Sequence, residues 1–320
     1  MKVSGIDAGR RRASPQQCGA GVSPVVRERK KVAGPPAGLS PTAVTGCRPL
    51  ITIRPSKGWS LADPGEVWKF RELLAALAIR DIKLRYRQTA LGVAWVVLQP
   101  LLASGILAFV FGTVAGVTKP AQSSVFIFVL AGFIGWLLFN TAFARAGQSL
   151  LQQSVLISKV FFPRIILPAS AAFAAFLDAG IGLALFALLA LSSGFRFSWQ
   201  IVSLPIWLAL LVMLAFGLGL VSAALSVRFR DVQHITPVLT QILFYASPVA
   251  YQTSAVPEKW RALFLMNPLA PLFEGLRWSL LGEGHLHSTG ILYATLVAVI
   301  VCALGLVIFH GFEKEFADVI

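Results

Sequence analysis

Long apolar stretches alternate with short basic ones along most of this chain. Six apolar stretches of membrane-spanning length lie at about 92–115, 124–143, 165–192, 201–227, 235–252 and 289–310. Each is close to the roughly 18–25 residues that an α-helix needs to cross a bilayer. The stretch at 235–252 is the weakest, because Pro237 and Pro248 lie near its ends. The pattern predicts an all-α membrane protein with six transmembrane helices.

A charged, helix-like segment precedes the first apolar stretch. From Glu66 to about Arg87, one stripe of the expected helix carries charges and the remainder is filled by Trp68, Phe70, Leu74, Leu77 and Ile82. Such a helix lies in the membrane interface, with its rings and leucines in the acyl boundary and its cations near lipid phosphates. The sequence therefore predicts an N-terminal amphipathic interfacial helix, for which electrostatic anchoring alone is a sufficient role.

Two further segments lie between the spans. Residues 148–159 can form a short amphipathic helix on the positively charged side. This helix is either a simple connector or a binding site for a soluble partner. Residues 257–281 contain apolar pieces that are too short to cross, divided by Asn267, Pro268 and Pro271. Paired short apolar segments fit a re-entrant outer hairpin between spans five and six, which a membrane tolerates only when it is buried in protein or lines a cavity.

The composition divides the chain into three predicted parts. Residues 1–50 are rich in Gly, Pro, Ser and Arg without a hydrophobic period, and are expected to be a disordered extension. Residues 51–90 form a cytoplasmic segment that contains the amphipathic helix, and residues 91–320 form the six-span domain.

The charge distribution sets an expected orientation. The mean hydropathy is +0.74 and only 13% of residues are charged, against about 25% in a soluble domain, which excludes a soluble enzyme. Much of the net charge of +14 lies in the first sixty residues and beside the spans, as with Arg145, Lys159 and Arg164, whereas the opposite side carries Lys119 and Arg196. Positive loops stay in the cytoplasm. Both termini are therefore expected to be cytoplasmic, and nucleic acid is not an expected partner.

The sequence contains little that suggests catalysis. It has no HExxH, GxSxG or DxD-type motif and no GxxxxGK[ST] phosphate loop, and its three cysteines are scattered. No metal site and no cofactor are predicted for this chain. Asp178 lies deep in the third span without an obvious cation partner. An intramembrane acid is a functional candidate, although a hydrogen-bonding role at a helix contact is favoured here.

Five motifs, in order, resemble the permease subunits of type-2 ABC exporters. They read "RDIKLRYRQTALGVAWVVLQPLL", "LISKVFFPRIILP", "VRFRDV", "MNPLAPLFEGLR" and "EKEFADVI", and the resemblance runs from about Ile51 to Ile320. It is closest to the branch that moves lipid-linked polysaccharides, such as O-antigen and capsule, or teichoic acids.

The resemblance implies an assembly. It consists of a homodimer of six-span subunits in the bacterial cytoplasmic (inner) membrane, with two cytoplasmic ATPase subunits that bind ATP and Mg. The family's gate helix falls on Glu66 to about Arg87 and its re-entrant segment on Pro257 to Leu281. Its coupling helix, which docks into the ATPase, implicates Gln148, Gln152, Leu156, Ile157 and Lys159.

The resemblance also implies contacts with the substrate. The polysaccharide branch lines its channel with aromatic rings, for which Trp136, Phe139, Phe244 and Tyr245 are the candidates. The cations of the gate helix that can bind lipid phosphate, or the pyrophosphate of a lipid-linked substrate, are Arg80, Lys83, Arg85 and Arg87.

The expected function is ATP-driven export of a lipid-linked polysaccharide or polyol-phosphate polymer, with the chain as a transport subunit and not an enzyme. A type-2 exporter of a drug or haem is the alternative. A membrane glycosyltransferase is disfavoured by the missing DxD carboxylate pair.

Overall fold

The computed structural model describes residues 68–87, 94–116, 118, 120, 123–159, 162–195, 197–282 and 286–313, all within the unit Pro55–Ile320. The predicted extension at 1–50 lies outside the described residues, as do the side chains of Arg85 and Arg87. Over the described ranges the protein is all-helical, without a β-strand.

The elements follow one another with short connections. In chain order they are α2 (Arg71–Arg87), α3 (Ala94–Ala108), the π-helical η1 (Phe109–Val114), α4 (Val125–Gln152), α5 (Ser154–Lys159), α6 (Ile166–Ser192), the 3₁₀ helix η2 (Trp199–Ser203), α7 (Leu204–Arg228), α8 (Val232–Ala246), the 3₁₀ helix η3 (Thr253–Ala255), α9 (Glu258–Leu265), α10 (Leu269–Leu281) and α11 (Ser288–Phe312).

Five helices in the described part are long and apolar enough to cross a membrane: α3 with η1, α4, α6, η2 with α7, and α11. They match five of the six predicted spans. Of the other predicted span, 235–252, only residues 235–246 belong to α8, and the whole of α8 has 15 residues, fewer than the ~20 that span a bilayer. Its chain leaves the helix at Ser247, just before Pro248. The sixth span therefore stays a prediction.

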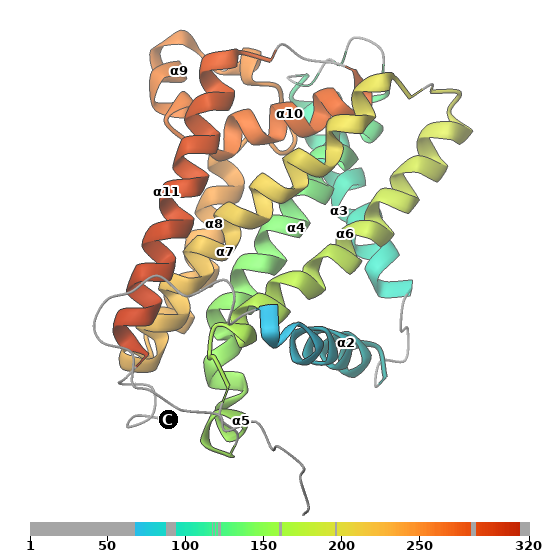
Figure 1. Cartoon of the computed structure of the whole chain (residues 1–320). Coiled ribbons are helices and arrows are strands. Elements are labelled where there is room, and N and C mark those ends of the chain that lie inside the picture. Colours follow the sequence, from blue (N-terminus) through green and yellow to red (C-terminus); the bar gives the residue numbers. More distant parts are fainter. Residues whose placement is uncertain are drawn as a thin grey trace, which may run out of the picture. The chain divides into compact units, whose positions relative to one another are not determined.

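The long helices form a bundle around α4 (Figure 1). α4 is the most deeply buried of the five and packs against α3, α6, α7 and α10, while α11 packs along α7. In Figure 1, α2 and α5 lie at the lower end of the bundle, and α9 and α10 lie at the upper end. We call these the α5 end and the α10 end.

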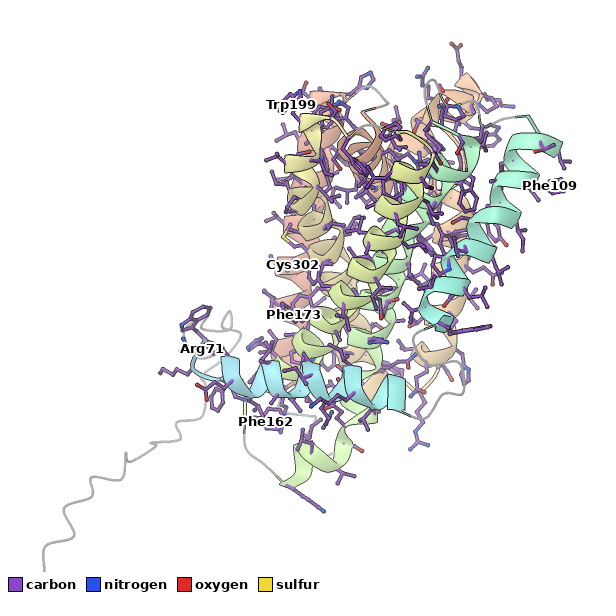
Figure 2. All side chains as sticks on the ribbon, turned by 90° about the vertical axis from the view of Figure 1, so that its right-hand side faces the viewer. Arg71, Phe109, Phe162, Phe173, Trp199 and Cys302 are labelled. Atoms are coloured by element: carbon purple, nitrogen blue, oxygen red, sulfur yellow. The ribbon has the colours of Figure 1, made fainter. Side chains whose placement is uncertain are left out.

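α2 crosses the α5 end of the bundle and packs against α6 (Figure 2). Residues 71–87 contain no Gly or Pro and are rich in Ala, Leu and Arg, which favour a helix. Leu77 is only 6% exposed and joins a core cluster with Phe162, Ile166 and Phe309. Its predicted position in the acyl boundary is therefore wrong, because this face of α2 meets protein. The partly buried Phe70 and Leu74 pack against the same cluster, whereas Trp68 and Leu84 are exposed.

Candidate functional site

The predicted coupling helix is divided into two helices. Gln148 and Gln152 belong to the last turns of α4, where the Gln152 amide donates to the Gln148 Oε1 at 3.0 Å. α4 runs this far because residues 125–152 contain no proline, and it ends at Gln153, whose backbone (φ −116°, ψ 27°) leaves the helical region. The separate helix α5 then occupies Ser154–Lys159.

α5 presents two different faces. Leu156 and Ile157 are partly buried and pack against the core cluster at the α5 end. Val155 is 64% exposed and Lys159 is also exposed. The sequence predicted Leu156 and Ile157 as docking residues and did not single out Val155, since the exposed face of so short a helix is defined only once its packing is known.

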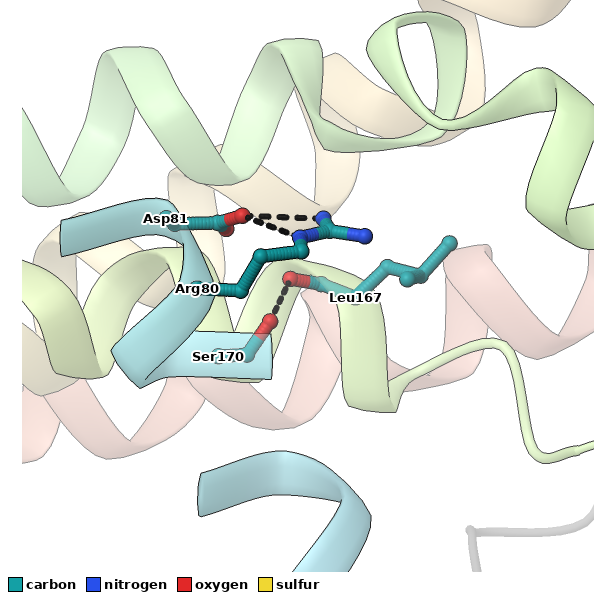
Figure 3. Close-up of polar contacts among 4 residues, drawn as sticks. All are labelled: Arg80, Asp81, Leu167 and Ser170. Carbon is teal, nitrogen blue, oxygen red and sulfur yellow. Dashed lines mark hydrogen bonds and ion pairs between the residues drawn. The ribbon is translucent and has the colours of Figure 1, made fainter. Parts of the chain in front are cut away.

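Of the four cations predicted for the gate helix, the structure describes the side chains of Arg80 and Lys83. The Arg80 guanidinium donates from Nη2 and Nε to the Asp81 Oδ1, at 2.9 and 3.2 Å (Figure 3). Lys83 is exposed. The neighbouring carboxylate of Asp81, visible in the sequence but not considered, lowers the local positive potential at Arg80.

The four candidate channel aromatics are brought together. Trp136 of α4 lies 5.1 Å from Phe244 of α8 and 5.7 Å from Phe139, between ring centroids, and Phe244 lies 5.4 Å from Tyr245. Exposure falls along this series, from 66% at Tyr245 to 0% at Phe139. Phe139 is thus covered by its own chain, and Tyr245 is the most accessible of the four rings.

A buried, non-helical segment lies at the α10 end, between α8 and η3. Residues Ser247 to Ala250 are buried, and their backbone groups need partners. The guanidinium of Arg277, only 3% exposed, donates to the carbonyl oxygens of Pro248, Val249 (2.8 Å) and Tyr251 (3.2 Å), and Cζ lies 4.2 Å from the centre of the Phe128 ring.

Other side chains also form hydrogen bonds with this segment and with the residue before it. We call the segment Ser247 to Ala250 together with its hydrogen-bond donors the Arg277 cage. Asn267 donates to the Ala246 carbonyl oxygen at 3.1 Å and to the Ser247 Oγ at 3.0 Å, and Thr118 donates to the Ala250 carbonyl oxygen at 2.7 Å. At Gly132 of α4, a Cβ atom would overlap the carbonyl oxygen of Val249. Burial lowers the pKa of Arg277 to about 10, so it stays charged at neutral pH.

Arg277 was not identified from the sequence. The available signal was a cation inside the largely apolar "LFEGLRWSLL", which also contains Glu274, because a charge in such a setting is retained only when it is paired or hydrogen-bonded. The two helices α9 and α10 occupy the residue range of the predicted re-entrant hairpin, 257–281.

Asp178 has a cation partner from another helix. Its Oδ2 lies 3.7 Å from the Nη2 of Arg145, and its side chain is 4% exposed. The expectation that Asp178 lacks such a partner is therefore wrong. It failed because Arg145 was assigned to the connection after the second span, whereas α4 continues through it.

No group of three or more His, Cys, Asp or Glu side chains that could hold a metal occurs in the described part of the chain.

Comparison with known proteins gives one consistent result. Residues 72–281 match the model of the ABC-2 type transporter membrane family. The chain is 31% identical to the O-antigen export system permease protein RfbA of Myxococcus xanthus, over 79% of this chain and 97% of that protein. It is 27% identical to RfbA of Klebsiella pneumoniae (78% and 95%) and 25% identical to the polysialic acid transport protein KpsM of Escherichia coli (75% and 93%). The chain belongs to the ABC-2 type transporter family.

Proposed function

We propose that this protein is the membrane-spanning permease subunit of an ATP-driven ABC exporter that moves a polysaccharide out of the cytoplasm. The observation that carries the proposal is the similarity to O-antigen and polysialic acid export permeases over nearly their whole length. The bundle of apolar helices agrees with a subunit that provides a path across the membrane.

We infer that the substrate is lipid-linked and that the path lies between two copies of the chain in the inner membrane. Gln99 on α3 and Gln241 on α8 are exposed on segments predicted to lie in the membrane. Polar groups are costly against lipid, and a second copy or a hydrated path supplies better surroundings. The accessible rings of Phe244 and Tyr245 on α8 would stack on sugar units in such a path.

We further infer that the α5 end faces the cytoplasm and binds the ATPase subunits. Cations gather on the elements at this end, among them Lys83, Lys159, Arg228 and Arg230, as expected for the cytoplasmic side. ATP and Mg then bind to the partner subunits, and both termini are cytoplasmic. The outer α9–α10 pair would form the re-entrant hairpin, and α8 with the segment after it would complete a sixth span.

Deletion of the gene tests the function directly. Loss of the permease should remove the polysaccharide from the cell surface and leave its lipid-linked precursor in the cytoplasm, because synthesis continues without export. Surface labelling and extraction of the cytoplasmic lipid fraction measure the two pools. A normal surface polysaccharide in the deletion strain would reject the proposal in favour of another cargo.

Nucleotide hydrolysis should require a second subunit. The purified chain in proteoliposomes is expected to show no ATPase activity, because it lacks a phosphate loop. Activity should appear when the ATPase subunit is added, and should disappear again when the phosphate-loop lysine of that subunit is replaced. Hydrolysis that persists in the highly purified chain alone would contradict this prediction.

Charge-conserving changes separate lipid anchoring from pyrophosphate binding. Arg85 and Arg87 changed together to Lys keep two cations but lose the guanidinium forks, which bind phosphate oxygens in a fixed geometry. We expect export to fall in this double variant while membrane insertion stays normal.

The control is the double change to Gln, compared at matched expression. Juxtamembrane cations contribute about 1 kcal/mol each to lipid binding whatever their type. If the Lys variant exports as well as the wild type and only the Gln variant fails, the two arginines are a lipid anchor.

A further inference from the structure

The Arg145–Asp178 ion pair joins the two helices that flank α5. Arg145 lies about two helical turns before the end of α4, and Asp178 lies near the middle of α6. Their charged atoms are 3.7 Å apart, with the carboxylate buried and the guanidinium half-buried. Since α5 connects α4 to α6, the pair links the two arms of a helical hairpin above the coupling segment.

A second connection holds α4 at the same level. A Cβ atom on Gly147 would lie 2.8 Å from the Ser222 Oγ, and one on Gly219 would lie 2.6 Å from the Ala146 Cβ. Small residues of this kind let membrane helices approach closely. Ser226 of α7 also donates to the Gly147 carbonyl oxygen, at 3.4 Å. The lower part of α4 is thus attached to α6 on one side and to α7 on the other.

α8 is attached much more loosely. Its links to the rest of the chain include the Ser222–Thr236 hydroxyl contact at 3.1 Å, the ring contact between Trp136 and Phe244, and the hydrogen bond from Asn267 to the Ala246 carbonyl oxygen at its last residue. Most of its remaining side chains are exposed, including Ile235, Val238 and Ile242. Any relative movement within the chain therefore meets less resistance between α4 and α8 than between α4 and α6.

We propose that Arg145 and Asp178 form a permanent intramembrane staple, which makes α4, α5 and α6 move as one body during transport. The proposal rests on the proposed function, because α5 receives the movement from the ATPase. A displacement of α5 then reaches Trp136 of α4 undiminished, and changes its position relative to Phe244 of α8. Opening the pair during the cycle would leave a buried carboxylate without its cation, which is strongly unfavourable.

A covalent replacement of the ion pair tests the staple. In a background with Cys18, Cys47 and Cys302 changed to Ala, Arg145→Cys and Asp178→Cys are introduced together and joined by a short bifunctional thiol reagent that a reductant can cleave. The reduced form should export at least about fivefold less glycan than the Cys-free parent, because the link between α4 and α6 is lost. Cross-linking should restore export, because it returns the link.

The matched control joins α8 to α7, the helix to which α4 is attached. Ser222→Cys with Thr236→Cys replaces two hydroxyl groups that lie 3.1 Å apart. Cross-linked in the same background, this variant should lose export and regain it on reduction, because α8 must move relative to the body that contains α4. The staple is overturned if cross-linking positions 145 and 178 blocks export, or if the reduced form exports as well as the Cys-free parent.

Thermal unfolding in detergent distinguishes failure of the staple from failure of the proposed function. If neither the wild type nor the Cys-free parent exports glycan, the proposed function is wrong. The staple is then tested by the thermal unfolding midpoint of the 145–178 variant alone. The 145–178 variant should then unfold at a higher temperature when cross-linked than when reduced. Equal midpoints overturn the staple.

Discussion

We expect Val155→Asp to abolish glycan export while the protein remains inserted and keeps the oligomeric state of the wild type. Val155 is 64% exposed on α5, at the end of the bundle for which we propose binding of the ATPase. A charge buried there without a partner costs about 3–5 kcal/mol, which is more than about a hundredfold in binding. The side chain at position 155 points away from the core of its own chain, so the effect of the substitution should be confined to docking.

The measurements are export, co-purification of the ATPase subunit, and the size-exclusion elution volume compared with that of the wild type. Leu263→Asp is the matched control, because Leu263 is 63% exposed on α9 at the opposite end of the bundle. It should leave ATPase binding unchanged. The corresponding changes at Leu156 and Ile157 should also stop export, but both side chains pack against the core, so their effect mixes docking with folding. Normal export and ATPase binding by Val155→Asp would place the docking surface elsewhere.

Arg277→Met destabilises the protein by about 3 kcal/mol or more, because hydrogen bonds from charged donors contribute about 1.5–3 kcal/mol each. The guanidinium donates to the carbonyl oxygens of Pro248, Val249 and Tyr251, and its loss leaves these buried acceptors without that donor. The Met side chain fills part of the space but donates no hydrogen bond. The Tm in detergent should fall by roughly 10 °C.

Two further variants separate the hydrogen-bond geometry from charge and from general sensitivity. Arg277→Lys keeps a cation but lacks the planar fork, and should recover only part of the stability. Arg261→Met removes an exposed arginine from the neighbouring α9, and should leave the Tm unchanged. A Tm for Arg277→Met equal to that of Arg261→Met would show that the segment after α8 is held by other contacts.

Most of the membrane architecture was predictable from the sequence. Five of the predicted spans coincide with long apolar helices, and the motifs around Arg80 and Asn267 indicated the family that the comparisons confirm. Both are local signals. Crossing a bilayer requires a continuous run of apolar residues. Such a run can be recognised from the sequence without knowledge of how the helices pack.

The candidate site was predictable only in part. Trp136, Phe139, Phe244 and Tyr245 were selected separately and lie in one series of ring contacts, although their role in the channel stays a prediction. The division of the coupling segment was not foreseen. Nothing in the residues between Gln148 and Gln152 distinguishes the last turns of a long helix from the start of a new one.

By itself, the sequence determined that the chain is helical, where its apolar helices lie, and that it contains no phosphate loop. The tertiary structure alone decided that Leu77 faces protein, that Arg145 meets Asp178, and that Arg277 holds the segment after α8. The physical reason is the same in each case. A span depends on neighbours in the sequence, whereas burial, ion pairing and carbonyl capping depend on which distant residues the packed helices bring within a few ångströms.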